Sequence, residues 1–560
     1  MKPLSVSESP SPARRALLIF CAAALVRIAY YLLIRRTACL DINLDPVSDM
    51  EAFHRWALTI VSGDWLGRTD FHPFHPWQTA VAAPRQWAAW YGHVFHQEPF
   101  YPYLVAFLYL LTSPGPTIVI LAQMTMGATG CALTYLAARR LVPEGAALCA
   151  GILAVLYGPY LYYESLVLRD SFMIPLTACL IWLLCEARAR AMRQSASAWW
   201  FAAGLVMGIS YITKAGILPF FLCLILWMAV DQIRRSPKSA RDFAPVLLMV
   251  IGFALAMAPL ALRNLIVGAP LLKITTRGPI EFINGNNRWH RGIGWFDGAD
   301  SRVSAYAAAT LSRAGGRLAP TVAAVLADWK DDPAGWALLQ ARKTAYFFAP
   351  FEMPNNASYA WFRLNCPLLR WGVLSFFLIS PLALAGLIES WRRWREFLVL
   401  YLFLATGVGL TITFYVIARF RAPFMPVMLI FAGLGLWSLA DHMRRARWGR
   451  LALCLVIIAG TLAVNRISDY ADRDLVRPQD YLIAIEGYRS RGETERALLE
   501  AEQGRRQFPA FPVFHREAAL LYLSQGRKAE AAAAFAEALA RDPSDTDARR
   551  ELMELRPPPP

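Results

Sequence analysis

Charged residues are scarce in this sequence, and acidic residues are scarcer than basic ones. Of 560 residues only 18% are charged, whereas 56% are hydrophobic, and the mean hydropathy is +0.35. This balance disfavours a soluble globular protein. The 57 basic residues outnumber the 41 acidic ones, but they lie in short clusters between apolar runs. Because they form no continuous basic stripe, we do not expect nucleic acid as a partner.

Apolar runs fill most of the chain before residue 466. Twelve runs of about 15 to 22 residues each approach the length that crosses about 30 Å of hydrocarbon. We therefore predict an all-α, polytopic helical membrane protein. The runs are residues 16–34, 99–113, 117–137, 146–163, 171–187, 199–213, 215–230, 244–262, 372–390, 397–416, 423–440 and 450–465.

The basic clusters orient these runs, because such clusters favour the cytoplasmic side. They contain Arg14/Arg15, Arg139/Arg140, Arg188/Arg190/Arg193, Arg234/Arg235/Lys238/Arg241, Arg392/Arg393/Arg395 and Arg444/Arg445/Arg447/Arg450. Every cluster falls on the cytoplasmic side if one early apolar run does not cross the membrane. The weakest run, 99–113, is short and bounded by "EPFYPY" and "TSPGP", so we predict an interfacial or re-entrant helix there.

About eleven crossings then remain. We predict a cytoplasmic tail at 1–15, a transmembrane domain at 16–466, and two outer loops at about 35–98 and 263–370. The first run ends in "LLIRR" without the small residues of a cleavage site, so we expect it to be retained. Seven of the nine cysteines lie inside apolar runs, whereas Cys39 and Cys366 lie near outer ends of spans and are candidates to pair.

Beyond a linker at 467–479 the sequence becomes polar and repeats itself. A constant offset of 34 residues relates Tyr488 to Tyr522, Gly492 to Gly526, Ala497 to Ala531 and Pro509 to Pro543. This pattern resembles tetratricopeptide repeats and predicts paired helices at 480–555, followed by a disordered tail, "RPPPP", at 556–560. Two repeats are fewer than a free-standing solenoid needs, so the unit should lean on the membrane domain or a partner. A docking surface and a folded tail are equally open.

The stretch "DPVSDMEAFHRWA", residues 45–57, sets three carboxylates outside the first span. Ser48 and Glu51 have the spacing of a capping box, and the apolar positions that follow predict an amphipathic helix over about 49–62 on the outer membrane surface. Asp45 precedes a proline, as in a turn. Asp49 has no such task, and its ionised carboxylate at the helix start could accept a proton or hold a metal. A merely favourable first-turn acid is the alternative.

Several further segments follow this loop in a set order. They are "AFHRWALTIVSGDW", "QEPFYPYLVAFLYLL", "YYESLVLRDS", "YITKAGILP", "APLALRN", "NGNN" and "ARFRAPFMPV". In this order, over about 16–440, they resemble bacterial membrane glycosyltransferases of the GT-C superfamily, of the protein O-mannosyltransferase and aminoarabinose transferase type (family 39). The resemblance implies an inverting transferase that passes a sugar from a polyprenyl-phosphate carrier to an acceptor at the outer face of the cytoplasmic membrane.

The resemblance also implies a role for the acidic residue of the first outer loop, here Asp49, as general base or acceptor-orienting group. The chain departs from the family pattern in two places. It has Asp49-Met-Glu51 instead of an adjacent Asp-Glu pair, and "QEPFYPY" where many relatives have a double proline. Glu98, in that second segment, is therefore the other catalytic candidate.

Five cations lie at or near the outer ends of spans, where an unpaired charge is costly. They are Arg169, Lys214, Arg263, Arg419 and Arg421. A lipid phosphate would supply the missing anion, so we predict that they bind the donor phosphate and stabilise it as the leaving group. For Arg169, pairing with Asp170 or Glu164 is the alternative, and for Lys214 it is snorkelling.

The second outer loop contains "EFINGNNRWHRGIGWFDG". Asn286, Asn287 and Trp289 are candidates to bind a sugar or acceptor, although Asn and Gly also make turns. Five of the eight histidines lie in the first outer loop: His54, His72, His75, His93 and His96. They lack a clear zinc signature, so we assign no metal ligands, and a divalent metal stays an open candidate as cofactor.

Two other classes of function stay open. A lipid or polysaccharide transporter or polymerase would use the outer cations to guide an anionic substrate, but it should carry ionisable residues deep in several spans, and chiefly Arg27 lies there. A membrane-anchored scaffold would depend on residues 480–560. Our first prediction remains the transferase, whose partners would be a polyprenyl-phosphate sugar donor, membrane lipid and a protein bound through the repeats.

Overall fold

The computed structural model describes residues 11–68, 73–190, 196–235, 239–294, 300–466 and 475–555, and every regular element within them is a helix. Eight stretches are long and apolar enough to cross a membrane. The predicted multi-pass helical membrane protein is confirmed. The linker segment 467–474, the tail 556–560 and His72 lie outside the described residues.

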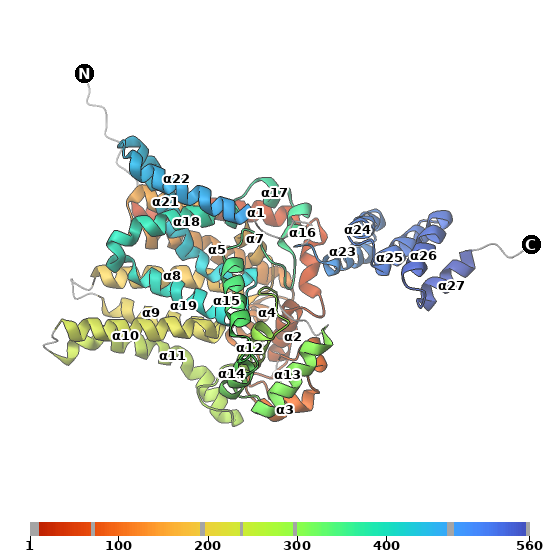
Figure 1. The fold of residues 1–560 in the computed structure, drawn as a ribbon, viewed down its shortest axis with the longest axis horizontal. Helices are drawn as coiled ribbons and strands as arrows, with labels where there is room; N and C mark the ends of the chain where they lie inside the picture. The colour runs from red at the N-terminus through yellow and green to blue at the C-terminus, as the bar shows by residue number, and fades with distance from the viewer. Residues whose placement is uncertain are drawn as a thin grey trace, which may run out of the picture.

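The bundle is built from helices that coincide with the predicted crossings (Figure 1). The eleven predicted runs contain α1 (Pro12–Ile34), α5 (Pro116–Ala138), α6 (Glu144–Leu156) with α7 (Gly158–Glu164), α8 (Arg169–Arg190), α9 (Ser197–Thr213), α10 (Leu218–Arg234), α11 (Ala244–Val267), α18 (Phe376–Ser390), α19 (Trp394–Thr413), α21 (Met425–Arg444) and α22 (Trp448–Arg466). One candidate span, Phe376–Thr413, contains both α18 and α19. Because α6 and α9 are only 13 and 17 residues long, the count of eleven stays a prediction.

Small residues let neighbouring helices of the bundle approach closely. α9 packs on α11, where a Cβ added to Gly204 would clash with the backbone of Met249. α18 packs on α21 in the same way, with Gly386 against the carbonyl of Phe431. Close backbone contact of this kind replaces the hydrophobic driving force that helices lose in lipid. The apolar sequence alone therefore sets the helices, and the small residues set how tightly they pair.

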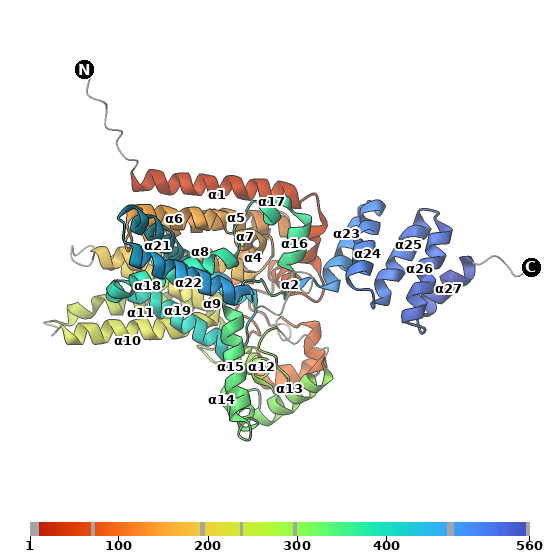
Figure 2. The ribbon, with the colours of Figure 1, turned by 45° about the horizontal axis from the view of Figure 1, so that its top comes forward.

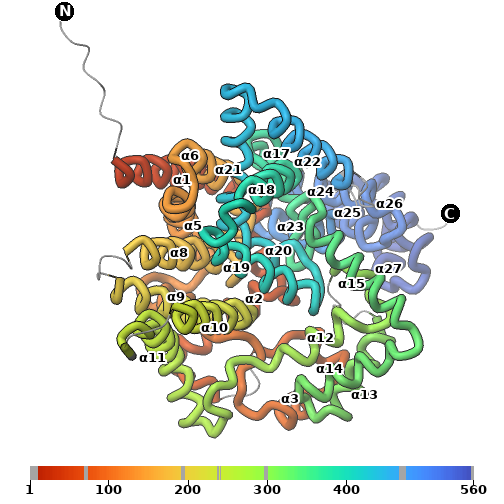
Figure 3. Tube along the Cα trace, turned by 60° about the vertical axis from the view of Figure 1, so that its left-hand side comes forward, coloured from red at the N-terminus to blue at the C-terminus, as the bar shows by residue number. Residues whose placement is uncertain are grey.

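The outer segments gather at one end of the bundle, opposite to the start of α1 (Figures 1 and 2). They comprise η1 (Ala38–Leu44), α2 (Asp49–Val61), η2 (Pro76–Ala80), α3 (Pro84–Tyr91), α4 (Phe100–Leu111), α12 (Gly278–Asn286), α13 (Ser301–Ala314), α14 (Leu318–Ala327), α15 (Pro333–Phe347), α16 (Tyr359–Asn365) and α17 (Pro367–Trp371). Figure 3 shows α12 to α15 as a group beside the bundle. α4 has 12 residues, too few to cross the bilayer, in keeping with the predicted interfacial helix.

The C-terminal residues form five helices beyond this outer end. They are α23 (Pro478–Ser490), α24 (Thr494–Gln507), α25 (Pro512–Ser524), α26 (Lys528–Arg541) and α27 (Thr546–Leu555). The repeat is visible in the backbone, since Gly492 and Gly526 have φ values of 75° and 74°. The residue after each glycine donates its N–H over 2.9 Å to the carbonyl of Tyr488 or Tyr522. We call α23 to α27 the repeat unit.

Two local expectations meet different outcomes. Arg27, the ionisable residue noted inside the first span, is paired with Glu164, whose carboxylate oxygens lie 2.6 and 2.7 Å from the guanidinium nitrogens. This pairing explains how a charge is tolerated there. Cys39 and Cys366 are both buried but are free thiols, so the candidate disulfide is absent.

Candidate functional site

Two cavities of opposite character lie at the outer end of the bundle. The polar cavity, of about 750 Å³, is lined by Asp49, His75, Trp77, Asn356, Arg419 and Arg477 among others. The apolar cavity, of about 430 Å³, is lined mainly by hydrophobic side chains of α10 and α19 and of the Phe414–Phe424 segment. Arg277, just before α12, lines both cavities. The two spaces therefore meet at one charged residue.

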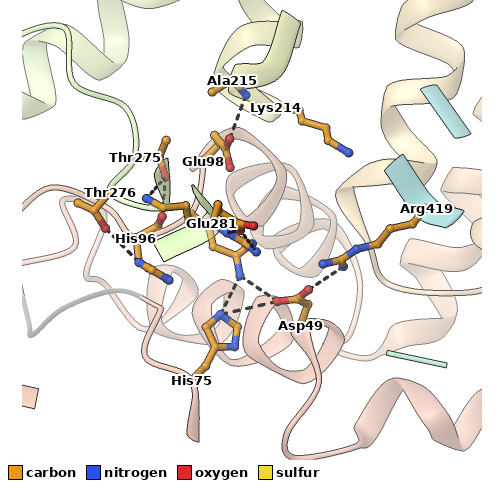
Figure 4. A network of polar contacts seen from close by, with 12 residues as sticks. Asp49, His75, His96, Glu98, Lys214, Ala215, Thr275, Thr276, Glu281 and Arg419 are labelled. Atoms are coloured by element: carbon orange, nitrogen blue, oxygen red, sulfur yellow. Dashed lines mark hydrogen bonds and ion pairs between the residues drawn. The ribbon is translucent and has the colours of Figure 1, made fainter. Parts of the chain in front are cut away.

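Asp49 is held by hydrogen bonds from three distant parts of the chain, and Figure 4 shows its ion pair with Arg419. Its Oδ1 accepts a hydrogen bond from Gln97 Nε2 at 3.0 Å. Its Oδ2 accepts one from Asn356 Nδ2 at 3.0 Å and one from Arg419 Nη1 at 2.6 Å. The carboxylate lines the polar cavity, so it is both oriented by the fold and open to a small molecule.

Local sequence puts Asp49 at this position. Ser48 caps α2, because its Oγ accepts the N–H of Glu51 at 3.2 Å. The predicted reciprocal half of the capping box is wrong: the N–H of Ser48 donates to the carbonyl of Asp45 at 3.0 Å, and Glu51 instead lies 3.5 Å from Arg55. Asp45 is the predicted turn residue, with its Oδ1 accepting the N–H of Val47 at 3.3 Å. Asp49 thus occupies the first position of α2.

The charge state of Asp49 is set by competing effects. Burial raises the pKa of its carboxyl, but the attraction of Arg419, with smaller contributions from His75, Arg277 and the hydrogen bond from Asn356, outweighs burial, and the pKa lies well below its ordinary value. Asp49 is therefore ionised at neutral pH. A carboxylate in this state orients a hydroxyl by accepting its hydrogen bond, and it becomes a stronger base when the positive charge beside it is drawn away.

Two buried histidines of the first outer loop stand beside Asp49. Burial lowers the pKa of His75 to about 4 and the pKa of His96 well below its ordinary value, so both rings are neutral at pH 7. Their ring centroids are 6.2 Å apart, and Gln97 Nε2 lies 2.7 Å from His75 Nε2. The side-chain amide of Gln97 thus bridges His75 and Asp49 and restrains the position of the carboxylate.

The polar cavity offers little to a metal ion. Asp49 Oδ1 and His75 Nε2 lie 3.7 Å apart, but no third metal-binding side chain joins them among the residues that the structure describes. Among the described residues, the one group of three side chains close enough to share a metal ion is Glu389, His442 and Cys454. None of these three residues lines the polar cavity.

The apolar cavity carries cations at its polar edge. Arg169 forms an ion pair with Glu98, and Lys214 forms one with Asp170. Arg169 therefore pairs with neither of its two predicted alternative partners, Asp170 and Glu164. Glu98 also accepts the N–H of Ala215 at 2.9 Å, and although burial raises the pKa of Glu98, Arg169 and this bond lower it overall. Glu98 is thus occupied in holding Arg169 and the turn after Lys214, and Figure 4 shows its contact with Ala215.

Arg263 and Arg421 line neither of these two cavities. The guanidinium of Arg263 donates to the carbonyls of Leu66, Gly67 and His93, and so fixes the first outer loop. That of Arg421 donates to the carbonyls of Phe347, Ala349 and Phe351 and to Glu352, and so fixes the second loop. Of the five predicted phosphate ligands, the structure brings Arg169, Lys214 and Arg419 to the cavities.

The predicted sugar ligands of the second loop also lie outside both cavities. Asn286 is buried and accepts a hydrogen bond from Lys343 at 2.9 Å. Asn287 donates to the carbonyls of Ile283 and Asn284 at the end of α12. The ring of Trp289 is 42% exposed and packs edge-on against Tyr306. In this structure their side chains stabilise the loop.

Sequence reasoning missed several residues that do line the polar cavity. Arg277, in "TTRGPIEF", is an outer-loop cation that the topology rule disfavours as much as the five selected ones, so a signal existed. Gln97 adjoins Glu98 in the quoted second segment. Asn356 and Arg477 carry no motif, because they reach the cavity only through the fold.

Residues 96–261 match the family model described as dolichyl-phosphate-mannose-protein mannosyltransferase. No curated protein is significantly similar. Similar solved structures include the apo oligosaccharyltransferase of Archaeoglobus fulgidus, at 15% identity and a TM-score of 0.44 over 84% of this chain and 57% of that one. They also include that organism's AglB with an inhibitory peptide and a dolichol-phosphate. It is 15% identical, with a TM-score of 0.42, over 81% of this chain and 55% of that one.

ArnT from Cupriavidus metallidurans in the apo state is similar at 15% identity and a TM-score of 0.42, over 97% of this chain and 76% of that one. The chain spans about half the length of the archaeal oligosaccharyltransferases. The matched family segment contains Glu98, Arg169 and Lys214, but neither Asp49 nor Arg419. Residues 96–261 are therefore related to the dolichyl-phosphate-mannose-protein mannosyltransferases, which confirms for this segment the GT-C-type resemblance predicted from the motifs.

Proposed function

We propose that this protein is an inverting glycosyltransferase that moves a sugar from a polyprenyl-phosphate-linked donor to an acceptor at the outer face of a bacterial cytoplasmic membrane. The observation that carries the proposal is the junction of an apolar, cation-edged cavity with a polar cavity that contains an ionised carboxylate. The family match over residues 96–261 supports the same reaction class. The basic clusters favour the outer orientation of this end.

The apolar cavity suits the lipid part of the donor. Its hydrophobic lining would accept an isoprenoid chain, while Lys214 and Arg169 at its edge would bind the phosphate. Among the described residues Lys214 pairs with Asp170 and Arg169 with Glu98 through single contacts, which leaves N–H donors on each cation for a phosphate. On this assignment Glu98 positions Arg169 and takes no proton from the acceptor.

The polar cavity suits the acceptor hydroxyl, with Asp49 as its proton acceptor. The hydroxyl oxygen would form a bond to the anomeric carbon as the bond from that carbon to the phosphate oxygen breaks. The hydroxyl proton passes to Asp49, and the lipid phosphate leaves against the cations. A single displacement of this kind inverts the anomeric centre.

Arg419 would link donor binding to the strength of this base. In the structure it neutralises Asp49 at 2.6 Å, and it precedes Phe420, whose ring lies 4.3 Å from Lys214 Nζ. A donor phosphate beside Lys214 would compete with Asp49 for Arg419. Drawing Arg419 away raises the pKa of Asp49 when the donor is in place, so the base gains strength only in the loaded enzyme.

The test compares two carboxylates of the same helix. A deletion strain is complemented with the wild type, with Asp49→Asn or with Glu51→Gln, and polyprenyl-phosphate sugars in lipid extracts are measured by mass spectrometry. We expect Asp49→Asn to lose about a hundredfold or more of its transfer rate and to let the donor accumulate. Glu51→Gln should behave as wild type, because Glu51 faces Arg55 and lines neither cavity. Full transfer by Asp49→Asn at normal membrane levels would overturn the proposal.

A further inference from the structure

The repeat unit takes part in the wall of the polar cavity. Arg477, Pro478 and Gln479, at the start of α23, line this cavity together with Asp49. Figures 1 and 2 show α23 against the outer end of the bundle beside α16, with the later repeats extending away from it. Residues more than four hundred positions apart in the sequence thus face the same space.

The first helix pair of the repeat unit is fixed to the entry of the first outer loop. The N–H of Ala38 donates to the hydroxyl of Tyr488 at 3.1 Å, and Arg491 Nη1 donates to Asp41 Oδ2 at 2.7 Å. Arg496 Nη1 reaches the carbonyl of Arg36 at 3.0 Å. These contacts all involve η1 or the turn before it, so the unit has a defined position on the membrane domain.

Arg477 connects the repeat unit to the loop before α16. Its Nη1 donates to the carbonyl of Asn355, and its backbone N–H donates to Ser358 Oγ at 3.2 Å. Ser358 in turn donates to Asp480. Loop 355–358 is thereby held at both ends by residues of the repeat unit.

The residue between these two ends orients the candidate base. Asn356 Nδ2 donates to Asp49 Oδ2 at 3.0 Å, and Asn356 Oδ1 lies 3.4 Å from the N–H of Asp49. A continuous path therefore runs from Arg477 through the backbone of loop 355–358 to the carboxylate of Asp49. It does not pass through any other outer helix.

The burial of charge along this path argues against a passive tail. Asp45 is 2% exposed and Asp480 is 0% exposed, and Arg477 Nη2 and Nε lie 3.7 and 3.6 Å from their carboxylates. Burial raises the pKa of both acids, which shows the cost of removing them from water. Removing Arg477 would leave these two buried carboxylates without their cation, so the contact of the repeat unit with the membrane domain depends on it.

We propose that Arg477 is a positioning residue of the transfer site, which makes the repeat unit a structural part of that site. Arg477 holds loop 355–358 so that Asn356 keeps the Asp49 carboxylate pointed into the polar cavity. The proposal rests on the proposed function, since it assigns a role in orienting the same base.

The experiment uses the full-length protein in membranes, with Arg477→Ala, Arg477→Lys, Asn356→Ala and the double variant Arg477→Ala/Asn356→Ala. The control is Arg489→Ala, on the same helix, where the exposed Arg489 pairs with Glu486 and Glu517 and lines neither cavity. The probe is the polyprenyl-phosphate sugar fraction that accumulates in the deletion strain. Transfer rate is measured against pH and donor concentration.

We expect Arg477→Ala to lower kcat by about ten- to a hundredfold with little change in the donor KM, because Asn356 then loses its hold on the ionised Asp49 carboxylate, which no longer points at the acceptor. The acid limb of the pH profile should move to higher pH, because a less stabilised carboxylate has a higher pKa. Asn356→Ala should do the same, and the double variant should be no worse than either single one. Arg477→Lys should recover part of the rate, and Arg489→Ala should match the wild type.

A normal kcat and an unmoved acid limb in Arg477→Ala would overturn the inference, as would losses that add in the double variant. Amide hydrogen exchange of residues 355–358 gives a readout that does not depend on the reaction. Faster exchange in Arg477→Ala, with unchanged exchange in α1, supports the contact and excludes global unfolding. If Asp49→Asn keeps full transfer, the proposed function fails while the exchange result still decides whether Arg477 holds the loop.

Discussion

The ion pair between Asp49 and Arg419 gives the sharpest test of the electrostatics of the site. Arg419 Nη1 lies 2.6 Å from Asp49 Oδ2, and the two side chains are only 8% and 13% exposed. Replacing Arg419 by Gln removes a full positive charge from this nearly dry contact and keeps a hydrogen-bond donor. The variant therefore isolates the contribution of charge to the pKa of Asp49.

The size of the effect follows from Coulomb's law. For charge centres about 4 Å apart and an effective dielectric constant of about 20, the attraction is about 4 kcal/mol. At about 1.4 kcal/mol per unit this would move the pKa by about three units, and carboxylates beside arginine shift by about one to three. We expect the pKa of Asp49 to rise by one to three units in Arg419→Gln, because Arg277 and Asn356 still act on it.

The assay is the pH dependence of kcat/KM for sugar transfer. The ionised carboxylate is the active form, so the rate falls as the pH drops through the pKa of Asp49, and a higher pKa moves this acid limb to higher pH. Arg419→Lys keeps the charge and should leave the limb near its wild-type position. An unmoved limb in Arg419→Gln, or an equal shift in Arg419→Lys, would refute the electrostatic account.

Three further predictions concern stability. Arg27→Met should destabilise the protein by about 3–5 kcal/mol because it strands the buried Glu164, and adding Glu164→Leu should restore most of the thermal stability in detergent; additive losses would contradict this. The native state resists protonation of His75 until about pH 4, whereas the unfolded state protonates near pH 6.5, so stability falls as the pH drops between these values, by about 3 kcal/mol. His75→Gln should reduce this loss, measured as the difference in melting temperature between pH 7 and pH 5, and equal acid sensitivity would count against it. Gly526 has a φ of 74°, so Gly526→Ala should lower the free energy of unfolding by about 1 kcal/mol. Gly460→Ala, in an open position of α22, should not lower it.

The sequence by itself determined the helices and the start of the candidate site. Hydrophobic run length and helical spacing are local properties, so the predicted helix at about 49–62 appears as Asp49–Val61, with Ser48 as its cap. The same reasoning separated Asp49 from Asp45, which forms its turn. It failed for the second half of the capping box, because the carbonyl of Asp45 takes the N–H of Ser48 before Glu51 can reach it.

Only the tertiary structure decided which side chains meet at the polar cavity. Arg419 and Arg421 are two residues apart, yet Arg419 pairs with Asp49 while Arg421 holds the carbonyls of the second outer loop. Their directions depend on what packs around a single short helix, and that packing comes from distant segments. Arg477 and Asn356 show the same limit, since neither carries a motif and each acquires its contact to the site only when the repeat unit docks on the membrane domain.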